Sequence, residues 1–230
     1  MSIPLAAGPP AAPRYRKRRI LTESGSVMLG VLLLIWSVTP IYNMFLVALD
    51  PEEGEIEFTG NIWPDDPSLD SFRVVLTQAD RYLEHFWRQF GNSLFIGLLT
   101  MFLTVLISSL ASFGMSRMGF RKASLLTNAA LLTYAVPASL LVFPFYGVVH
   151  GYGLSNTLWA VIAAHATFAS PLAILILQQY ARLIPTELDD AARVDGASAF
   201  QAYLRLYLPL MKPGLAIVAF YALLLAWNDY

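Results

Sequence analysis

A polar segment, residues 182–212, lies between two apolar stretches. It holds the residues whose types and spacing point most specifically to a function. Its first part carries Ala191 and Ala192 beside charged side chains. Small side chains on a helix surface allow a second protein to approach closely, whereas bulky side chains would block it. The chemistry that we expect here is therefore docking into a groove of another protein. No nucleophile, base and orienting group can be assembled from the loops, so we do not predict an enzyme.

Local signals predict that this segment folds as two short helices. Thr186 and Asp189 have the spacing of a capping box at the start of the first helix. Ser198 and Gln201 repeat that spacing for the second helix. Gly196 lies between them and offers an unhindered turn. The segment is therefore too well structured for a simple linker.

The second of these helices is expected to have one apolar face. Large apolar and aromatic residues fall on it: Phe200, Tyr203, Leu204 and Tyr207. We expect this face to pack on the apolar part of the chain. Pro209 is expected to end the helix, because proline cannot donate the next backbone hydrogen bond.

The apolar stretches that position this segment require a bilayer as their solvent. Hydrophobic residues make up 57% of the 230 positions and charged residues 13%, with a mean hydropathy of +0.55. One soluble core cannot bury so much apolar surface. Since a helix satisfies its own backbone hydrogen bonds in lipid, the pattern predicts an all-α integral membrane bundle of five transmembrane helices. The five charge-free runs are 25–49, 92–116, 123–149, 154–180 and 213–228.

The distribution of lysine and arginine predicts a cytoplasmic N-terminus. Basic side chains gather before the first run, between the second and third, and between the fourth and fifth, so these regions are expected in the cytoplasm. The loop 50–91 has three arginines against ten acidic residues and is expected to face outward. Residues 1–24 are expected to form a disordered basic tail, and residues 25–230 the transmembrane domain.

The polar segment also matches a known loop signature. That signature runs Glu-Ala-Ala, three residues, Gly, nine residues, Ile-x-Leu-Pro. This chain has Asp190-Ala191-Ala192, then Gly196, then Leu206-Tyr207-Leu208-Pro209, at the same spacing. Asp replaces Glu at 190 and Leu replaces Ile at 206, and both changes are chemically conservative. The segment resembles the coupling loop of the membrane permease subunits of ABC importers.

Neighbouring residues resemble the carbohydrate-importing branch of that family, of the maltose-type G subunit. The similar stretches are 153–157, 184–188, 194–198, 209–213 and 227–230. Family members usually have six spans, so this chain, which stops after its fifth run, is expected to lack the last helix. By this resemblance, the residues that couple the chain to an ATPase are Glu187, Asp190, Ala191, Ala192, Asp195, Gly196, Leu208 and Pro209.

The resemblance implies a permease subunit that moves a sugar across a bacterial or archaeal cytoplasmic membrane, in contact with membrane lipid. Two ATPase subunits, a second permease subunit and an extracytoplasmic sugar-binding protein are the implied partners. The chain has no Gly-x-x-x-x-Gly-Lys-Ser/Thr phosphate loop, so we expect ATP and Mg²⁺ on the ATPase subunits and no cofactor here. The net charge of −1 favours no nucleic-acid partner.

Candidates for the sugar path are polar or aromatic residues within the apolar runs: Asn128, Tyr134, Tyr146 and His165. Aromatic rings can stack on sugars, but residues of these types also make interhelical hydrogen bonds and packing contacts. The three histidines lack the spacing of metal ligands, so no metal site is predicted.

Two other functions remain open. A permease for another solute, such as a polyol phosphate, an amino acid or a peptide, could carry the same loop, although the apolar runs lack the Lys or Arg that a phosphate would need. A non-transporting membrane scaffold could use the same bundle, and it would not depend on an ATPase partner.

Overall fold

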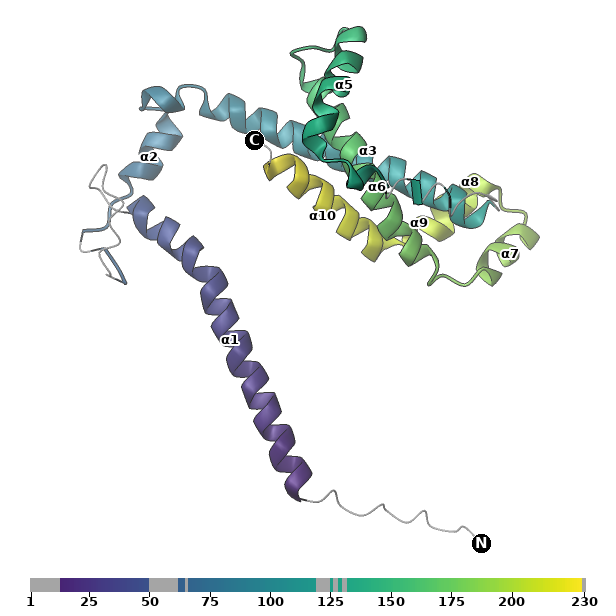
Figure 1. The fold of residues 1–230 in the computed structure, drawn as a ribbon, viewed down its shortest axis with the longest axis horizontal. Coiled ribbons are helices and arrows are strands. Elements are labelled where there is room, and N and C mark those ends of the chain that lie inside the picture. Colours follow the sequence, from purple (N-terminus) through teal and green to yellow (C-terminus); the bar gives the residue numbers. More distant parts are fainter. Residues whose placement is uncertain are drawn as a thin grey trace. The chain divides into compact units, whose positions relative to one another are not determined.

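The computed structural model describes residues 13–49, 62–64, 66–118, 125, 128–129 and 132–228 (Figure 1). Every regular element within these ranges is a helix, as the sequence predicts. The chain forms two compact units, Met1–Phe86 and Trp87–Tyr230, and each is described by itself.

The first unit begins with α1, Pro13–Leu49. The sequence predicts a disordered tail up to residue 24, and this prediction is wrong for 13–24, which are helical. Proline fits the first position of a helix, where its missing N–H has no partner to lose, and no glycine or further proline follows before Gly25. Residues 1–12 lie outside the described part of the chain.

The predicted outer loop, 50–91, lies partly outside the described residues. Its described part contains α2, Asp70–Thr77, and η1, Arg81–Leu83, and it ends within the next long helix. The backbone N–H of Ser68 donates to the carbonyl of Leu49, at 2.8 Å, so the segment before α2 returns to the end of α1.

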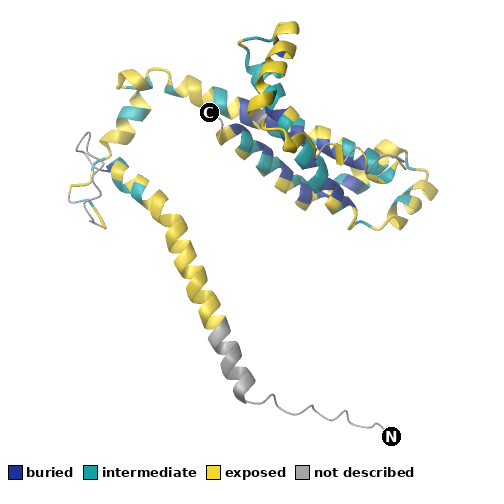
Figure 2. Cartoon of the chain, in the orientation of Figure 1, coloured by how far each residue is buried: buried dark blue, intermediate teal, exposed yellow. Residues whose placement is uncertain are grey.

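Three helices form the core of the second unit: α3 (Phe86–Arg117), α6 (Leu158–Ala181) and α10 (Lys212–Asn228). Buried residues recur every four positions along α3 and α10, which places them on one face of each helix. They include Thr100, Thr104, Ser108 and Ser112 on α3, and Gly214, Val218, Ala222 and Ala226 on α10. Because most of these side chains are small, the helices can approach closely. Figure 2 shows the buried faces turned toward one another inside this bundle.

Within the described residues, three helices are long and apolar enough to cross a membrane: Glu23–Leu49, Arg81–Arg117 and Leu158–Ala181. A fourth is added if Ala199–Leu210 and Lys212–Asn228, which are bent by 80° at a short break, count as one span. These helices cover the first, second, fourth and fifth predicted runs. The all-α membrane fold is therefore confirmed.

The third predicted run, 123–149, differs from the single helix that we expect. Its described part contains a short turn, η2 (Thr133–Ala135), and then α5 (Ala138–Gly151). Pro137 separates η2 from α5. Val136, which precedes it, has an extended backbone, with φ −91° and ψ 121°. Proline disfavours the helical conformation of the preceding residue, which explains the break. α5 alone is 14 residues long, or about 21 Å, and is too short for a full span.

The polar segment folds as predicted in outline. It contains α7 (Glu187–Val194), α8 (Ala199–Ala202), the π-helical turn η3 (Tyr203–Tyr207) and α9 (Leu208–Leu210). The capping box at Ser198 and Gln201 is confirmed, since each side chain accepts a hydrogen bond from the other's backbone N–H, at 3.3 and 2.8 Å.

Two other local predictions for this segment are wrong. Thr186 makes no capping hydrogen bond with its side chain, because its own backbone is already helical, with φ −70° and ψ −21°. Pro209 does not end the second helix, because it lies at the start of α9, where a missing N–H is tolerated. The break comes two residues later, at Met211.

Candidate functional site

α7 is a short helix whose surface is open to a partner. None of the residues of Glu187–Val194, all of which the structure describes, is buried. Asp190 and Ala191 are exposed, whereas Ala192 is half-buried. At eight residues, α7 is about 12 Å long. Six of the predicted coupling residues therefore lie together, on α7 or on the turn that follows it.

The turn after α7 requires glycine. Gly196 has φ +78°, a conformation that side chains with a Cβ rarely adopt. Its N–H donates to the carbonyl of Arg193, and the N–H of Ala197 donates to the carbonyl of Ala192, at 3.0 and 2.9 Å. This pair of bonds is a Schellman motif, which satisfies the last carbonyls of the helix. The glycine prediction is confirmed as a structural requirement.

The remaining two predicted residues lie on α9. Leu208 is half-buried and Pro209 is exposed. Tyr203 and Tyr207 on the preceding turn are buried, so the predicted packing face is confirmed for these two residues. The prediction is wrong for Phe200 and Leu204, which are exposed. Leu204 lies in the π-helical turn η3, whose register differs from that of an α-helix, so an ideal 3.6-residue period misplaces it.

The two buried tyrosines attach the second half of the segment to α3. The hydroxyl groups of Tyr203 and Ser109 lie 2.7 Å apart and share a hydrogen bond. The hydroxyl of Tyr207 donates to Oγ of Ser112 at 2.9 Å. Both rings also pack on Phe113, with centroid distances of 5.3 and 5.1 Å. This attachment combines buried hydrogen bonds with aromatic packing.

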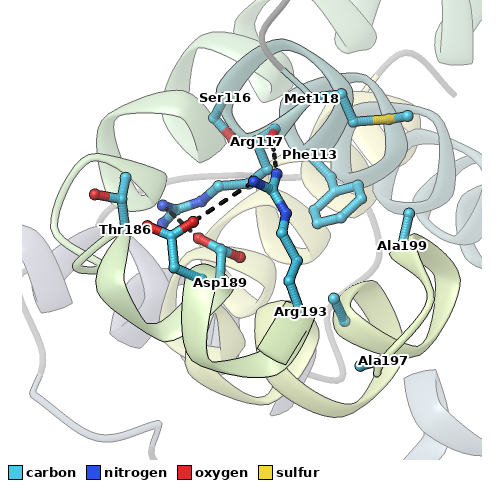
Figure 3. A pocket seen from close by; sticks show the side chains of 11 residues that line it. Phe113, Ser116, Arg117, Met118, Thr186, Asp189, Arg193, Ala197 and Ala199 are labelled. Atoms are coloured by element: carbon cyan, nitrogen blue, oxygen red, sulfur yellow. Dashed lines mark hydrogen bonds and ion pairs between the residues drawn. The ribbon is translucent and has the colours of Figure 1, made fainter. Parts of the chain in front are cut away.

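An ion pair attaches the first half of the segment, α7, to the end of α3. Nη1 of Arg117 lies 2.8 Å from Oδ2 of Asp189, and the two side chains are only 5% and 14% exposed (Figure 3). Nη2 of the same arginine donates to the carbonyls of Ala181 and Ile184, at 3.0 and 2.8 Å. We call these four residues the Arg117 clamp. It joins the ends of α3 and α6 to α7.

The other charges of α7 are held more loosely. Asp190 and Arg193 form an ion pair at 3.5 Å, but both side chains are mostly exposed. An exposed pair of this kind contributes little to stability. Arg193 also reaches back to the carbonyl of Arg117, at 3.5 Å. These residues are therefore available to a partner at small cost.

The Arg117 clamp was not predicted from the sequence. There Arg117 counts only among the basic residues between the second and third runs, and Asp189 only as part of a capping box. An arginine directly after an apolar run needs an acidic partner once it is buried, and this position is the signal that the sequence offers. That signal does not say which acid, because the two residues are 72 positions apart.

A cavity of about 590 Å³ lies beside the Arg117 clamp. The described residues that line it come from the end of α3, from α7 and the turns beside it, and from α8, and include Phe113, Ser116, Asp190 and Ala202. Figure 3 shows the side chains of Arg117 and Asp189 meeting in this space. The residues that line the cavity therefore do not pack α7 closely against the bundle.

The predicted sugar-path residues occupy different environments. The hydroxyl of Tyr134 donates to the carbonyl of Phe168 at 2.9 Å and lies 3.3 Å from the hydroxyl of Tyr221, so it links η2 to α6 and α10. His165 is buried within α6. Asn128 is exposed, and most of its neighbours in sequence lie outside the described residues.

Tyr146 is the candidate that faces a cavity. Its side chain is exposed on α5, stacks on His150 with ring centroids 6.1 Å apart, and lines a cavity of about 570 Å³. Phe168 and Phe145 line the same cavity, whose walls come from α5, α6 and the turn between them. Within the described residues, no group of three or more His, Asp or Glu side chains could hold a metal ion.

Comparisons with known proteins identify the family of this chain. The family described as binding-protein-dependent transport system inner membrane component matches residues 104–230, which include the whole polar segment. The chain is 32% identical, over 202 residues, to a trehalose transport system permease protein, SugB, of Mycobacterium tuberculosis (strain CDC 1551 / Oshkosh). That match covers 88% of this chain and 71% of the relative.

Two further relatives are similar over comparable lengths. A diacetylchitobiose uptake system permease protein, DasC, of Streptomyces coelicolor is 29% identical, over 93% of this chain and 75% of the relative. An arabinooligosaccharides transport system permease protein, AraQ, of Halalkalibacterium halodurans is 32% identical, over 84% and 68%.

A solved structure has the same fold. It is the crystal structure of a bacterial ABC transporter involved in the import of the acidic polysaccharide alginate. The TM-score is 0.74 with 21% identity, and the match covers 97% of this chain and 75% of that one. The family match spans more than half of the chain, and the permease relatives align over most of it. The chain therefore belongs to the family of binding-protein-dependent transport system inner membrane components.

Proposed function

We propose that this chain is a permease subunit of an ABC importer and that it moves a sugar across the cytoplasmic membrane. The observation that carries the proposal is the open surface of α7, where Ala191 lies beside acidic side chains on a helix with no buried residue. The names of the three relatives, which refer to trehalose, diacetylchitobiose and arabinooligosaccharides, support a carbohydrate as the solute.

In this proposal α7 docks into a cleft of an ATPase subunit, with Glu187, Asp190, Ala191, Ala192 and Asp195 at the contact. Two ATPase subunits bind ATP and Mg²⁺ and supply the hydrolysis. Closure of their clefts moves α7, and the bundle switches between inward and outward access. The chain itself binds no cofactor and acts as a transport subunit rather than an enzyme.

A second permease subunit completes the pathway, and an extracytoplasmic sugar-binding protein delivers the solute to the outer loops. The membrane is the cytoplasmic membrane of a bacterium or an archaeon. Along the sugar path we propose stacking on Tyr146, which faces a cavity lined by further aromatic side chains. Tyr134 is hydrogen-bonded within the bundle and His165 is buried in it, so in this proposal both side chains position the walls of the path.

Transport assays test this proposal. The chain would be reconstituted into lipid vesicles with its ATPase and sister permease, and uptake would be measured with labelled trehalose, chitobiose and an arabino-oligosaccharide. Labelled glycerol phosphate, an amino acid and a dipeptide would serve as comparison solutes. We expect uptake of a sugar that requires ATP hydrolysis. Uptake of a comparison solute alone would show a permease of another class, and assembly without any ATP-dependent uptake would favour a scaffold.

A further inference from the structure

α7 is not held on the bundle by apolar packing. Its eight residues are all described and none is buried. The cavity of about 590 Å³ separates part of α7 from the end of α3. Polar contacts must therefore fix the position of α7 relative to the transmembrane helices, because close packing, which normally transmits a displacement between helices, is incomplete there.

The contacts of Arg117 fit that task. Its guanidinium is planar and presents donors in a fixed fork, so a displacement of one partner is passed to the others. One arm meets Asp189 at 2.8 Å, and the other donates to the carbonyls of Ala181 and Ile184, at the end of α6. The last carbonyls of a helix carry partial negative charge, which favours a cation at this place. The contacts thus join α7 to α3 and α6 at one side chain.

We propose that Arg117 is the positioning residue that transmits the movement of α7 to α3 and α6, with Asp189 as its partner on α7. This inference rests on the proposed function, in which α7 docks into an ATPase. Arg117 itself does not touch the ATPase, because its side chain is 5% exposed and faces the bundle side of α7. Its role is to pass the movement of the docked α7 on to α3 and α6.

Because the second half of the polar segment has its own attachment to the bundle, the role of Arg117 can be tested separately from folding. Tyr203 and Tyr207 hold η3 on α3 by buried hydrogen bonds and by packing on Phe113. These contacts do not involve Arg117 or Asp189. A variant that weakens the Arg117 clamp therefore keeps the segment attached to the bundle, and the exposed face of α7 stays available to the ATPase.

Asp189→Asn is the main test, because it keeps the shape of the side chain and removes its charge without changing α3. The assembled transporter would be purified, and two quantities would be measured: the ATPase retained per permease, and the sugar transported per ATP hydrolysed. We expect unchanged retention and a loss of about three- to thirtyfold in sugar per ATP. Asp189→Glu, which keeps the charge, should restore most of that ratio.

Arg117→Lys provides a second variant that keeps the positive charge. A lysine ammonium is a compact point charge and cannot form the fork, so we expect a loss in sugar per ATP here as well. Arg182→Gln is the matched control, because it removes an exposed arginine next to Ala181. The control should leave both quantities as in the wild type.

Two results would overturn the inference. If Asp189→Asn and Arg117→Lys both transport as much sugar per ATP as the wild type, the Arg117 clamp does not transmit movement. If Asp189→Asn instead loses the ATPase, Asp189 is a docking residue and not a partner in transmission. Failure of the proposed function would look different, since Ala191→Arg on the exposed face of α7 would then keep the ATPase.

Discussion

The hydroxyl of Tyr207 donates a hydrogen bond of 2.9 Å to Oγ of Ser112, which is 95 positions earlier in the chain. This bond joins the π-helical turn of the polar segment to the buried face of α3. We expect Tyr207→Phe to lower the free energy of unfolding by about 1 kcal/mol, because the ring stays packed while Ser112 loses a buried partner. Thermal unfolding of the purified chain in detergent measures the effect.

Tyr152→Phe is the control for this change, because Tyr152 is largely exposed. It should leave the midpoint of unfolding unchanged. Equal midpoints for Tyr207→Phe and Tyr152→Phe would contradict the importance of the attachment to Ser112.

Gly214 lies at a close approach between α10 and α6. A Cβ at this position would lie 2.9 Å from Cγ of Tyr180 and 3.3 Å from Cδ2 of Leu177. Because the neighbours must move, we expect Gly214→Ala to lower the free energy of unfolding by about 1–3 kcal/mol. Gly114→Ala, in the interior of α3, has open space for its methyl group and should not destabilise the chain. Equal unfolding midpoints for the two variants would show that α10 has room to shift.

The turn at Gly196 gives a prediction about backbone conformation. Its φ of +78° costs about 1–2 kcal/mol for most residues and less for asparagine. We therefore expect Gly196→Val to abolish sugar-stimulated ATP hydrolysis in the assembled transporter and Gly196→Asn to retain part of it. Gly30→Val, at an exposed glycine of α1 with open space for a side chain and no positive φ, should retain the stimulation. Full stimulation in Gly196→Val would refute a requirement for this turn.

Tyr146 tests the proposed sugar path. Removal of its ring from the cavity between α5 and α6 by Tyr146→Ala should raise the apparent KM for sugar uptake up to about tenfold, because a stacking surface is lost. Tyr146→Phe keeps the ring and should keep the KM within about twofold. If the two variants have the same KM as the wild type, the ring does not contact the sugar.

Much of the architecture could be predicted from local patterns. Long charge-free runs identify α3, α6 and α10 because the bilayer sets the length of a span. The capping box at Ser198 and the positive φ of Gly196 are local features, decided by side chains within a few residues, and both are confirmed. The break near Pro137 also has a local cause, although its consequence for a continuous span was not predicted.

The contacts between distant residues could not be predicted. The sequence shows that Arg117 follows an apolar run, but several acidic residues in the polar segment could have paired with it, and only the position of α7 beside the end of α3 selects Asp189. The cap at Thr186 fails because the backbone of Thr186 is itself helical. Asp189, whose side chain would complete the capping box, faces Arg117 instead.

Co-purification measures whether α7 docks into an ATPase. The tagged chain would be expressed with its ATPase and sister permease, as wild type and as Ala191→Arg, which places a long charged side chain on an exposed position of α7. Ala79→Arg, at an exposed alanine before η1, is the matched control. We predict that the wild type and the control retain the ATPase and that Ala191→Arg retains at least about tenfold less. Equal retention by all three, or by none, would show that α7 is not the surface that docks into the ATPase.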